Sequence, residues 1–501
     1  MSQSVPHPRS GAKPLAKRAN HRWWVLAVVS VAQLMIVLDV TIMNIALPSA
    51  QHDLGFSNDL RQWIVTAYSL AFGSLLLVGG RLADIIGRKI TFIIGLIGFA
   101  AASAFGGAAQ NFAMLATGRA IQGLFAALLA PSALSLLTTT FSDSKDRPKA
   151  FAIFGAVVGS GAAIGLLLGG ALTQYLDWRW CLYVNLIFTV GALIGAIILL
   201  PRRKGDDVPS FDLPGTITAV AGLFCVVYGL SNAETHAWSA PQTWVFLAVG
   251  VAILVLFVFF ETRVRHPLLP LRIPGDRDRG GSYLAVFITG AGMFGCFLFV
   301  TYYLQEMLRY SPVRTGLAFL PMVACVMIAA QISTIMLLPR IGPQIPVALG
   351  MLLAAGGMAW LTGIQIQGNY PVQILPQTIL VGLGMGFVIA PAMNVATMGV
   401  RPADAGVASA MVNTSQQIGG AVGIALLSSL ATGAVTRFLT GKRPTPVVQA
   451  EATLHGYTTA FWWSAGIFAA GAVICGLLIR PGRTQPVTSG ENESESVSVM
   501  I

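Results

Sequence analysis

The sequence contains little charge. Asp, Glu, Lys and Arg make up 10% of its 501 residues, whereas they make up about 25% of a typical soluble domain. Hydrophobic residues make up 55%, and the mean hydropathy is +0.72. This composition excludes a soluble globular fold and predicts a membrane protein.

Patterns for metal binding, histidine relays and nucleotide binding are also missing. The five cysteines lie in or beside apolar segments without metal-ligand spacing, so we interpret them as packing residues and expect no metal site. The six histidines fall in tails or predicted loops, which leaves no buried histidine to relay a proton. No Gly-x-x-x-x-Gly-Lys-Ser/Thr motif occurs, so the sequence gives no support for a process driven by ATP, and no cofactor is expected.

Long apolar segments dominate the chain instead. Most of them have the roughly 20 residues that a membrane-spanning helix needs, and backbone groups in lipid must be satisfied within the segment, which predicts α-helices. The first one is too long for a signal peptide and lacks a cleavage site, so it is expected to be retained. The weakest are 213–230 and 346–366. Fourteen segments are centred near residues 36, 72, 99, 126, 160, 190, 222, 252, 294, 325, 355, 384, 420 and 468.

The basic residues are distributed unevenly between the two sides of these segments. With the amino terminus inside, the tail 1–22 and the even-numbered loops hold 23 Lys or Arg, the outward loops hold seven, and Arg119 lies within a segment. The positive-inside rule then predicts that both termini are cytoplasmic in a cell (inner or plasma) membrane. Despite a pI of 9.7, the basic residues are scattered over short loops, so no nucleic-acid partner is expected.

One carboxylate interrupts the first apolar segment. Asp39 lies in LDVTIMNIALP, residues 38–48, and an ionisable group at membrane depth is costly enough to indicate function and to require a partner. Arg119 is the candidate, because helix rise places the two residues about 13 and 10 Å below the outer surface. The alternative is that the pair only fixes helix packing.

The second segment ends in a glycine-rich loop, GGRLADIIGRK at residues 79–89. Gly80 is expected to allow close helix approach and Gly87 a tight turn, while Asp84 can pair with Arg88 or Lys89. A basic loop that only sets topology is the alternative. The pattern resembles the signature loop of the major facilitator superfamily. That resemblance implies a conformational latch in which Asp84 faces the amino-terminal end of a helix near residues 403–406.

Three further stretches carry the same resemblance. Arg119-Ala-Ile-Gln122-Gly resembles the superfamily's proton-transfer motif, in which the arginine tunes a nearby acid; an arginine paired with backbone carbonyls is the alternative. Trp178, Arg179, Trp180 and Asn185 resemble an aromatic and cationic belt at the outer interface. Segment 151–172 resembles the antiporter motif, although the family proline is Leu166 here. Its small faces for helix packing are formed by Gly155, Gly159, Gly161, Gly165, Gly169 and Gly170.

The whole layout resembles the fourteen-helix drug:proton antiporter family of this superfamily. An echo of the first loop at residues 339–342 indicates two related halves. We therefore expect an all-α polytopic membrane protein with a major facilitator fold, arranged as 6 + 2 + 6 helices. Its predicted parts are a basic tail (1–22), a first bundle (23–201), two additional helices and a linker (202–280), a second bundle (281–480) and a disordered tail (481–501).

The resemblance implies a proton-coupled exporter of lipophilic compounds, cationic ones included, that works by alternating access with a site between the halves. Its partners would be a small-molecule substrate, protons and the bilayer, without an obligate protein partner. Asp39 and Arg119 are the proton-coupling candidates. The substrate-cavity candidates are Asn44, Tyr68, Gln122, Tyr302, Tyr303, Glu306, Asn413 and Gln417, and the latch candidates are Gly80, Asp84, Gly87, Arg88 and Lys89.

Two alternatives remain from the sequence. A dedicated exporter of one metabolite or self-made antibiotic would share the fold and the coupling. A membrane-embedded enzyme would need a cluster of His, Asp or Glu near one interface, and the sequence shows none, so we expect a protein that is not an enzyme.

Overall fold

The computed structural model describes residues 15–141, 146–200, 212–236, 238, 240–264, 267–397, 400, 405–443 and 445–481, which contain helices and no strand. Two π-helical turns, η1 (Tyr303–Met307) and η2 (Ser333–Leu337), interrupt the α-helical series. The α-helices are α1 (Leu15–Leu54), α2 (Asn58–Ile86), α3 (Arg88–Gly107), α4 (Phe112–Thr140), α5 (Arg147–Tyr175), α6 (Trp180–Leu199), α7 (Leu213–His236), α8 (Pro241–Arg263), α9 (Arg277–Tyr302), α10 (Pro312–Ile332), α11 (Leu338–Ile341), α12 (Gln344–Leu361), α13 (Tyr370–Gln373), α14 (Leu375–Thr397), α15 (Ala405–Leu439) and α16 (Pro446–Leu478).

The predicted all-α fold with fourteen apolar segments is confirmed. Thirteen helical spans in the described part of the chain are long and apolar enough to cross a membrane, and α5 occupies the position of the fifth predicted segment. Three spans are composite, because α9 continues into η1, α10 into η2 and α11, and α13 into α14. One boundary is shorter than predicted: the segment expected at 346–366 is α12, which ends at Leu361 before a turn at Thr362 and Gly363.

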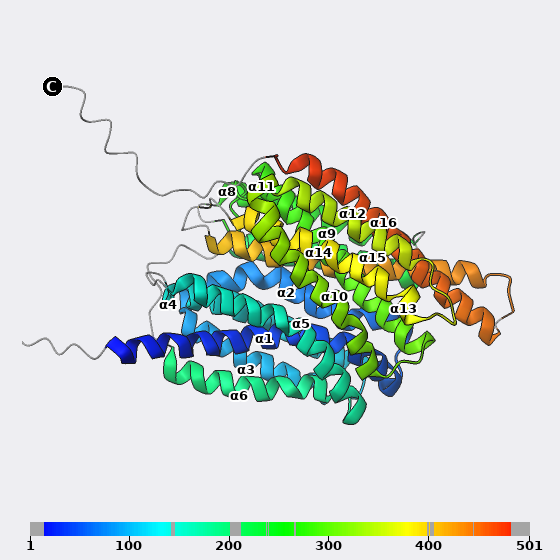
Figure 1. Ribbon diagram of the computed structural model, residues 1–501, viewed down its shortest axis with the longest axis horizontal. Helices are drawn as coiled ribbons and strands as arrows, with labels where there is room; N and C mark the ends of the chain where they lie inside the picture. The colour runs from blue at the N-terminus through cyan, green and yellow to red at the C-terminus, as the bar shows by residue number, and fades with distance from the viewer. Residues whose placement is uncertain are drawn as a thin grey trace, which may run out of the picture.

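The helices form two groups. Figure 1 shows α1 to α6 together along one side and α9, α10, α12, α14, α15 and α16 along the other, with the start of α1 and the end of α16 at the same end of the molecule. The groups touch mainly where α2 packs against α15 and α5 packs against α10. The residue boundaries predicted for the domains stay predictions, and most of the two tails lies outside the described residues.

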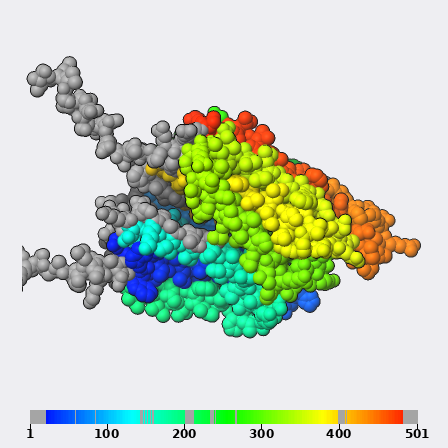
Figure 2. All heavy atoms as spheres, in the orientation of Figure 1, coloured from blue at the N-terminus to red at the C-terminus, as the bar shows by residue number. Residues whose placement is uncertain are grey.

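Glycines on α5 allow this helix to approach its neighbours on both sides. A Cβ at Gly169 would lie 2.9 Å from the Cα of Ile42 in α1, and one at Gly170 would lie 2.7 Å from the carbonyl oxygen of Pro312 in α10. Gly165 likewise packs against Thr41 of α1. In Figure 2 the green spheres of α10 abut the blue-green spheres of α5. The packing of Gly155 and Gly159 lies outside the described residues.

The additional helices α7 and α8 pack against each other, and α7 also packs against the seam between the two groups. Val227 of α7 forms an apolar cluster with Leu70 of α2 and with Ala421 and Ala425 of α15. One helix of each group therefore contacts the additional pair.

The turn between α2 and α3 has the predicted tight geometry at Gly87, whose φ is 102°. The close helix approach was assigned to the wrong glycine: Gly79 packs against the backbone of Ala127, whereas a Cβ at Gly80 would be in ordinary contact, 3.7 Å from Pro131. Lys89 donates to the carbonyl oxygens of Ile197 and Leu200 at 2.8 and 2.6 Å.

Both predicted partners in the latch, Asp84 and residues 403–406, have side chains outside the described ones. The latch therefore stays a prediction, and so does the role of Arg88 in it.

The described histidines correct a detail of the sequence interpretation. His21 and His52 lie on α1 and His455 lies on α16, not in loops. All three side chains are exposed, because these helices extend beyond their apolar cores. None of these three side chains is therefore placed as a buried proton relay.

Candidate functional site

The structure brings Asp39 of α1 and Arg119 of α4 together. The guanidinium Nη1 of Arg119 lies 2.5 Å from Oδ2 of Asp39, and both side chains are 1% exposed. The matching depths derived from helix rise correctly paired these residues. An unpaired charge at such a buried position would cost several kcal/mol, so each group requires the other.

The Asp39 carboxylate accepts hydrogen bonds from three side chains. Besides Arg119, Gln122 donates to Oδ1 at 3.1 Å and Asn185 donates to Oδ1 at 2.7 Å. Ser103 accepts from the same two amides at 2.6 and 3.3 Å. Four helices, α1, α3, α4 and α6, thus converge on one carboxylate, and charge-assisted hydrogen bonds of this kind offset the cost of burying it.

Sequence reasoning missed two members of this cluster. Asn185 was assigned to a belt at the outer interface, but its side chain is fully buried and reaches Asp39, so that assignment is wrong. Ser103 was not considered at all. A lone amide in the otherwise apolar α6 was the available signal for Asn185; small hydroxyls are too frequent in membrane helices to single out Ser103.

The rest of the predicted belt lies at helix ends, beside the end of α1. Arg179 Nη1 lies 2.7 Å from Oδ2 of Asp53, and the indole of Trp178 donates to the same oxygen at 3.1 Å. Trp178 is nevertheless buried, while Trp180 is exposed. The contacts of Arg179 and Trp178 with Asp53 connect the end of α1 to the turn before α6.

Arg119 also contacts α2. Its Nε donates to the carbonyl oxygen of Ile64 at 3.4 Å, and its guanidinium carbon lies 4.4 Å from the centre of the Tyr68 ring. Two buried polar atoms of the cluster, the Tyr68 hydroxyl and Oδ1 of Asn185, have no hydrogen-bond partner in the described structure. Both can change partners when the charge on Asp39 changes.

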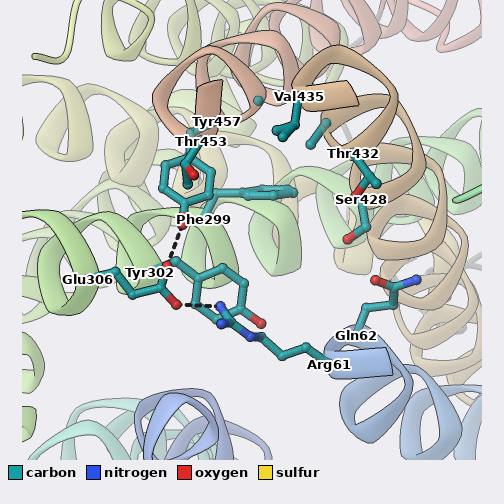
Figure 3. Close-up of a pocket in the computed structure, with 12 residues that line it drawn as sticks. Arg61, Gln62, Phe299, Tyr302, Glu306, Ser428, Thr432, Val435, Thr453 and Tyr457 are labelled. Atoms are coloured by element: carbon teal, nitrogen blue, oxygen red, sulfur yellow. Dashed lines mark hydrogen bonds and ion pairs between the residues drawn. The ribbon is translucent and has the colours of Figure 1, made fainter. Parts of the chain in front are cut away.

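A second ion pair bridges the two helix groups. Arg61 Nη1 of α2 lies 2.7 Å from Oε1 of Glu306 in η1. Tyr457 of α16 donates to Oε2 of Glu306 at 2.9 Å, and the guanidinium carbon of Arg61 lies 4.0 Å from the centre of the Tyr302 ring. Figure 3 shows Arg61 reaching across from α2 toward Glu306 and Tyr302. Arg61 had been counted among the outward-loop cations, but it is a buried residue of α2.

This ion pair separates two cavities. One, of about 200 Å³, lies between α2, α9, α15 and α16 and is lined by Phe299, Tyr302 and Tyr457 together with Ser428 and Thr432 (Figure 3). The other, of about 680 Å³, lies at the turn between α1 and α2 and the turn between η1 and α10. Arg61 and Glu306 line both cavities, so the pair lies where the two cavities meet.

Two of the eight predicted cavity residues, Tyr302 and Glu306, line the smaller cavity. Gln122 and Tyr68 belong to the Asp39 cluster instead. Tyr303 points elsewhere, because its hydroxyl donates to the carbonyl oxygen of Gln365 at 2.6 Å. The remaining three do not line this cavity either: Asn44 and Gln417 are buried and Asn413 is exposed.

We predict a larger coupling energy for the ion pair between the groups than for the pair at the outer surface. A double-mutant cycle with Arg61→Gln and Glu306→Gln, read by thermal unfolding in detergent, should give about 1–3 kcal/mol. The matched cycle on Arg179 and Asp53, whose side chains are 28% and 45% exposed, should give less than about 1 kcal/mol. Equal values would contradict a buried bridge between the groups.

The fold and the site together define a class: a multi-pass membrane protein made of two helix groups, with a buried ion pair in the first group and a second ion pair that joins the two groups. The chain belongs to the Major Facilitator Superfamily, whose family model matches residues 29–424.

Relatives extend over nearly the whole chain. The puromycin resistance protein pur8 of Streptomyces alboniger is 46% identical over 480 residues, which covers 95% of this chain and 94% of the relative. The cephamycin export protein CmcT of Amycolatopsis lactamdurans is 37% identical, over 82% of this chain and 85% of the relative.

The fold also matches a solved structure. A bacterial homologue of the human lysosomal transporter Spinster, in an inward-facing and unoccupied conformation, superposes with a TM-score of 0.64, at 16% sequence identity and over 94% of this chain and 98% of that one. At this identity the match concerns the fold alone.

Proposed function

We propose that this protein is a proton-coupled efflux transporter that exports lipophilic small molecules from the cell by alternating access. The observation that carries the proposal is the Asp39 carboxylate, buried at membrane depth and held by three donors from two other helices, α4 and α6. Relatives named for puromycin resistance and cephamycin export support the direction of transport.

In this proposal Asp39 carries the proton. Ionised Asp39 holds Arg119; a proton arriving from outside neutralises Asp39 and weakens its bond to the guanidinium. The unpartnered Oδ1 of Asn185 can then accept a hydrogen bond from the protonated carboxyl after the amide turns over. The cluster thus has partners for both protonation states of Asp39.

The coupling to transport runs through α2. Arg119 bonds to the carbonyl oxygen of Ile64, and Ile64 lies one helical turn from Arg61, whose bond to Glu306 bridges the groups. Two further hydrogen bonds join the groups near the outer ends: Gln305 to the carbonyl oxygen of Ile45 at 3.1 Å, and the Val313 amide to Gln174 at 3.3 Å. Release of Arg119 would therefore act on the helix that holds the outer side closed.

The driving force is sufficient for export. One proton that moves inward across about 100 mV releases about 2.3 kcal/mol, which sustains roughly a fiftyfold gradient of a neutral substrate. The excess of basic residues on the even-numbered loops supports a cell-membrane location with both termini in the cytoplasm.

The lining of the smaller cavity fits lipophilic compounds. Aromatic rings of Phe299, Tyr302 and Tyr457 line it beside one carboxylate, that of Glu306. Such a surface accepts apolar bodies and can hold a cation at Glu306 when Arg61 withdraws. A second candidate is a dedicated exporter of one antibiotic, which the names of the two relatives favour, since each names a single compound.

Purified protein in proteoliposomes tests the proposal. An imposed proton gradient should drive the accumulation of a lipophilic antibiotic such as puromycin, and a protonophore should stop it. A susceptibility panel in cells with and without the gene separates the two candidates: protection against several unrelated compounds supports a broad exporter, and protection against one supports a dedicated exporter. Accumulation that ignores the protonophore would refute proton coupling.

A further inference from the structure

Two buried carboxyl groups face each other where the additional helices meet the linker. Asp212 immediately precedes α7 and is 5% exposed, and Glu261 lies in the last turn of α8 and is 4% exposed. Neither residue takes part in the Asp39 cluster or the ion pair between the helix groups.

Each carboxyl uses one oxygen to hold the backbone. Oδ1 of Asp212 accepts from the amide of Gly215 at 2.9 Å, and Oε2 of Glu261 accepts from the amide of Leu269 at 3.0 Å. The second oxygens, Oδ2 of Asp212 and Oε1 of Glu261, are buried without another partner in the described structure. Both of these oxygens point toward Gly215, since a Cβ added to this glycine would collide with each of them.

The second oxygens of the two carboxyl groups therefore face each other at one buried point. An ionised carboxylate can only accept a hydrogen bond, so two ionised groups could not satisfy each other there, whereas one protonated and one ionised group could. We propose that Asp212 and Glu261 share one proton and form a second proton-binding site, separate from Asp39, that fastens the inner ends of the additional helices to the linker. Two interacting acids of this kind release their protons in two separated steps.

The elements packed around the pair also carry arginines, namely Arg263 of α8, Arg272 of the linker and Arg81 of α2. Arg263 and Arg272 are exposed, and the guanidinium of Arg263 lies 4.9 Å from the centre of the Phe259 ring.

The shared proton would hold the additional helices against both halves of the transporter. Leu269, whose amide Glu261 binds, packs with Ala219 of α7 and Phe257 of α8. Leu77 of α2 and Met411 of α15 pack against this cluster. Loss of the proton would place two negative charges side by side in a buried site and loosen the contact. The pair thus makes the position of α7 and α8 depend on cytoplasmic pH.

Thermal unfolding of the purified full-length protein as a function of pH tests the site. Raising the pH removes the shared proton, so the wild type should lose thermal stability, with a fall in Tm of about 2 °C or more. Asp212→Asn and Glu261→Gln each introduce an amide NH₂ group, which donates a hydrogen bond at any pH. Each variant should therefore show a smaller fall in Tm as the pH rises. Asp276→Asn, at an exposed helix cap with its Oδ1 bonded to the Arg279 amide, is the matched control and should keep the wild-type slope.

An infrared measurement secures the result if one variant is poorly folded. The wild type near neutral pH should show the C=O stretch of a protonated carboxylic acid that is lost in Asp212→Asn and in Glu261→Gln but kept in Asp276→Asn. An unchanged spectrum in both variants, or an unchanged pH slope of Tm, would overturn the shared proton. Neither measurement uses transport, so this failure would leave the proposed function untouched.

Discussion

Replacement of Asp39 by Asn is expected to abolish substrate-evoked proton release while folded protein is retained. The variant removes the titratable group and keeps its shape. Arg119 does not become isolated, because its Nη1 also donates to Oε1 of Gln122 at 2.9 Å and its Nε donates to Ile64. The amide of Asn can also bond to the amides of Gln122 and Asn185 that now serve the carboxylate.

Proton flux on addition of substrate decides between the two roles of Asp39. Proteoliposomes with equal amounts of folded wild type and Asp39→Asn should differ completely in flux, whereas substrate binding or downhill exchange should survive. Asp53→Asn, which changes an exposed carboxylate at the outer end of the same helix, should behave as the wild type. Substrate-evoked proton release that persists in Asp39→Asn would rule out this residue as the carrier. If Asp39 only served packing, folded protein and transport would fall together, with coupling intact in the remainder.

Replacement of Arg119 by Ala is expected to cause the largest loss of stability. The variant leaves the Asp39 carboxylate buried with two amide donors and no positive charge, and removal of one partner from a buried pair costs about 3–5 kcal/mol. It also removes the contacts with Ile64 and the Tyr68 ring. Both transport and the yield of folded protein should drop.

A double variant isolates the electrostatic part of this loss. Asp39→Asn combined with Arg119→Gln leaves no buried charge, so the yield and Tm of folded protein should recover toward the wild type while proton coupling stays absent. Arg119→Lys should recover only part of the stability, because an ammonium group cannot serve Asp39, Gln122 and Ile64 with the same planar geometry. Size-exclusion profiles and thermal unfolding measure both. A single Arg119→Ala variant with the wild-type Tm would contradict the structural account.

The packing against glycines shows where sequence reasoning reached its limit. Gly79 and Gly80 are adjacent, and the sequence assigned the close approach to Gly80, yet α2 presents Gly79 to Ala127. Neighbouring residues on a helix point about 100° apart, so the answer depends on how α2 is rotated against α4. The hydropathy pattern does not predict this rotation of α2, because lipid and protein interior are similarly apolar.

The sequence by itself determined the membrane class, the fourteen apolar segments and the pairing of Asp39 with Arg119. These follow from lengths and depths along single helices, since every backbone group in lipid must be satisfied within its own helix and the rise per residue is constant. Only the tertiary structure decided what meets across helices: Asn185 at Asp39, Ser103 at Asn185, Arg61 at Glu306, and Asp212 beside Glu261. Such contacts join residues far apart in the chain, and they depend on the order and rotation of packed helices, which no local pattern specifies.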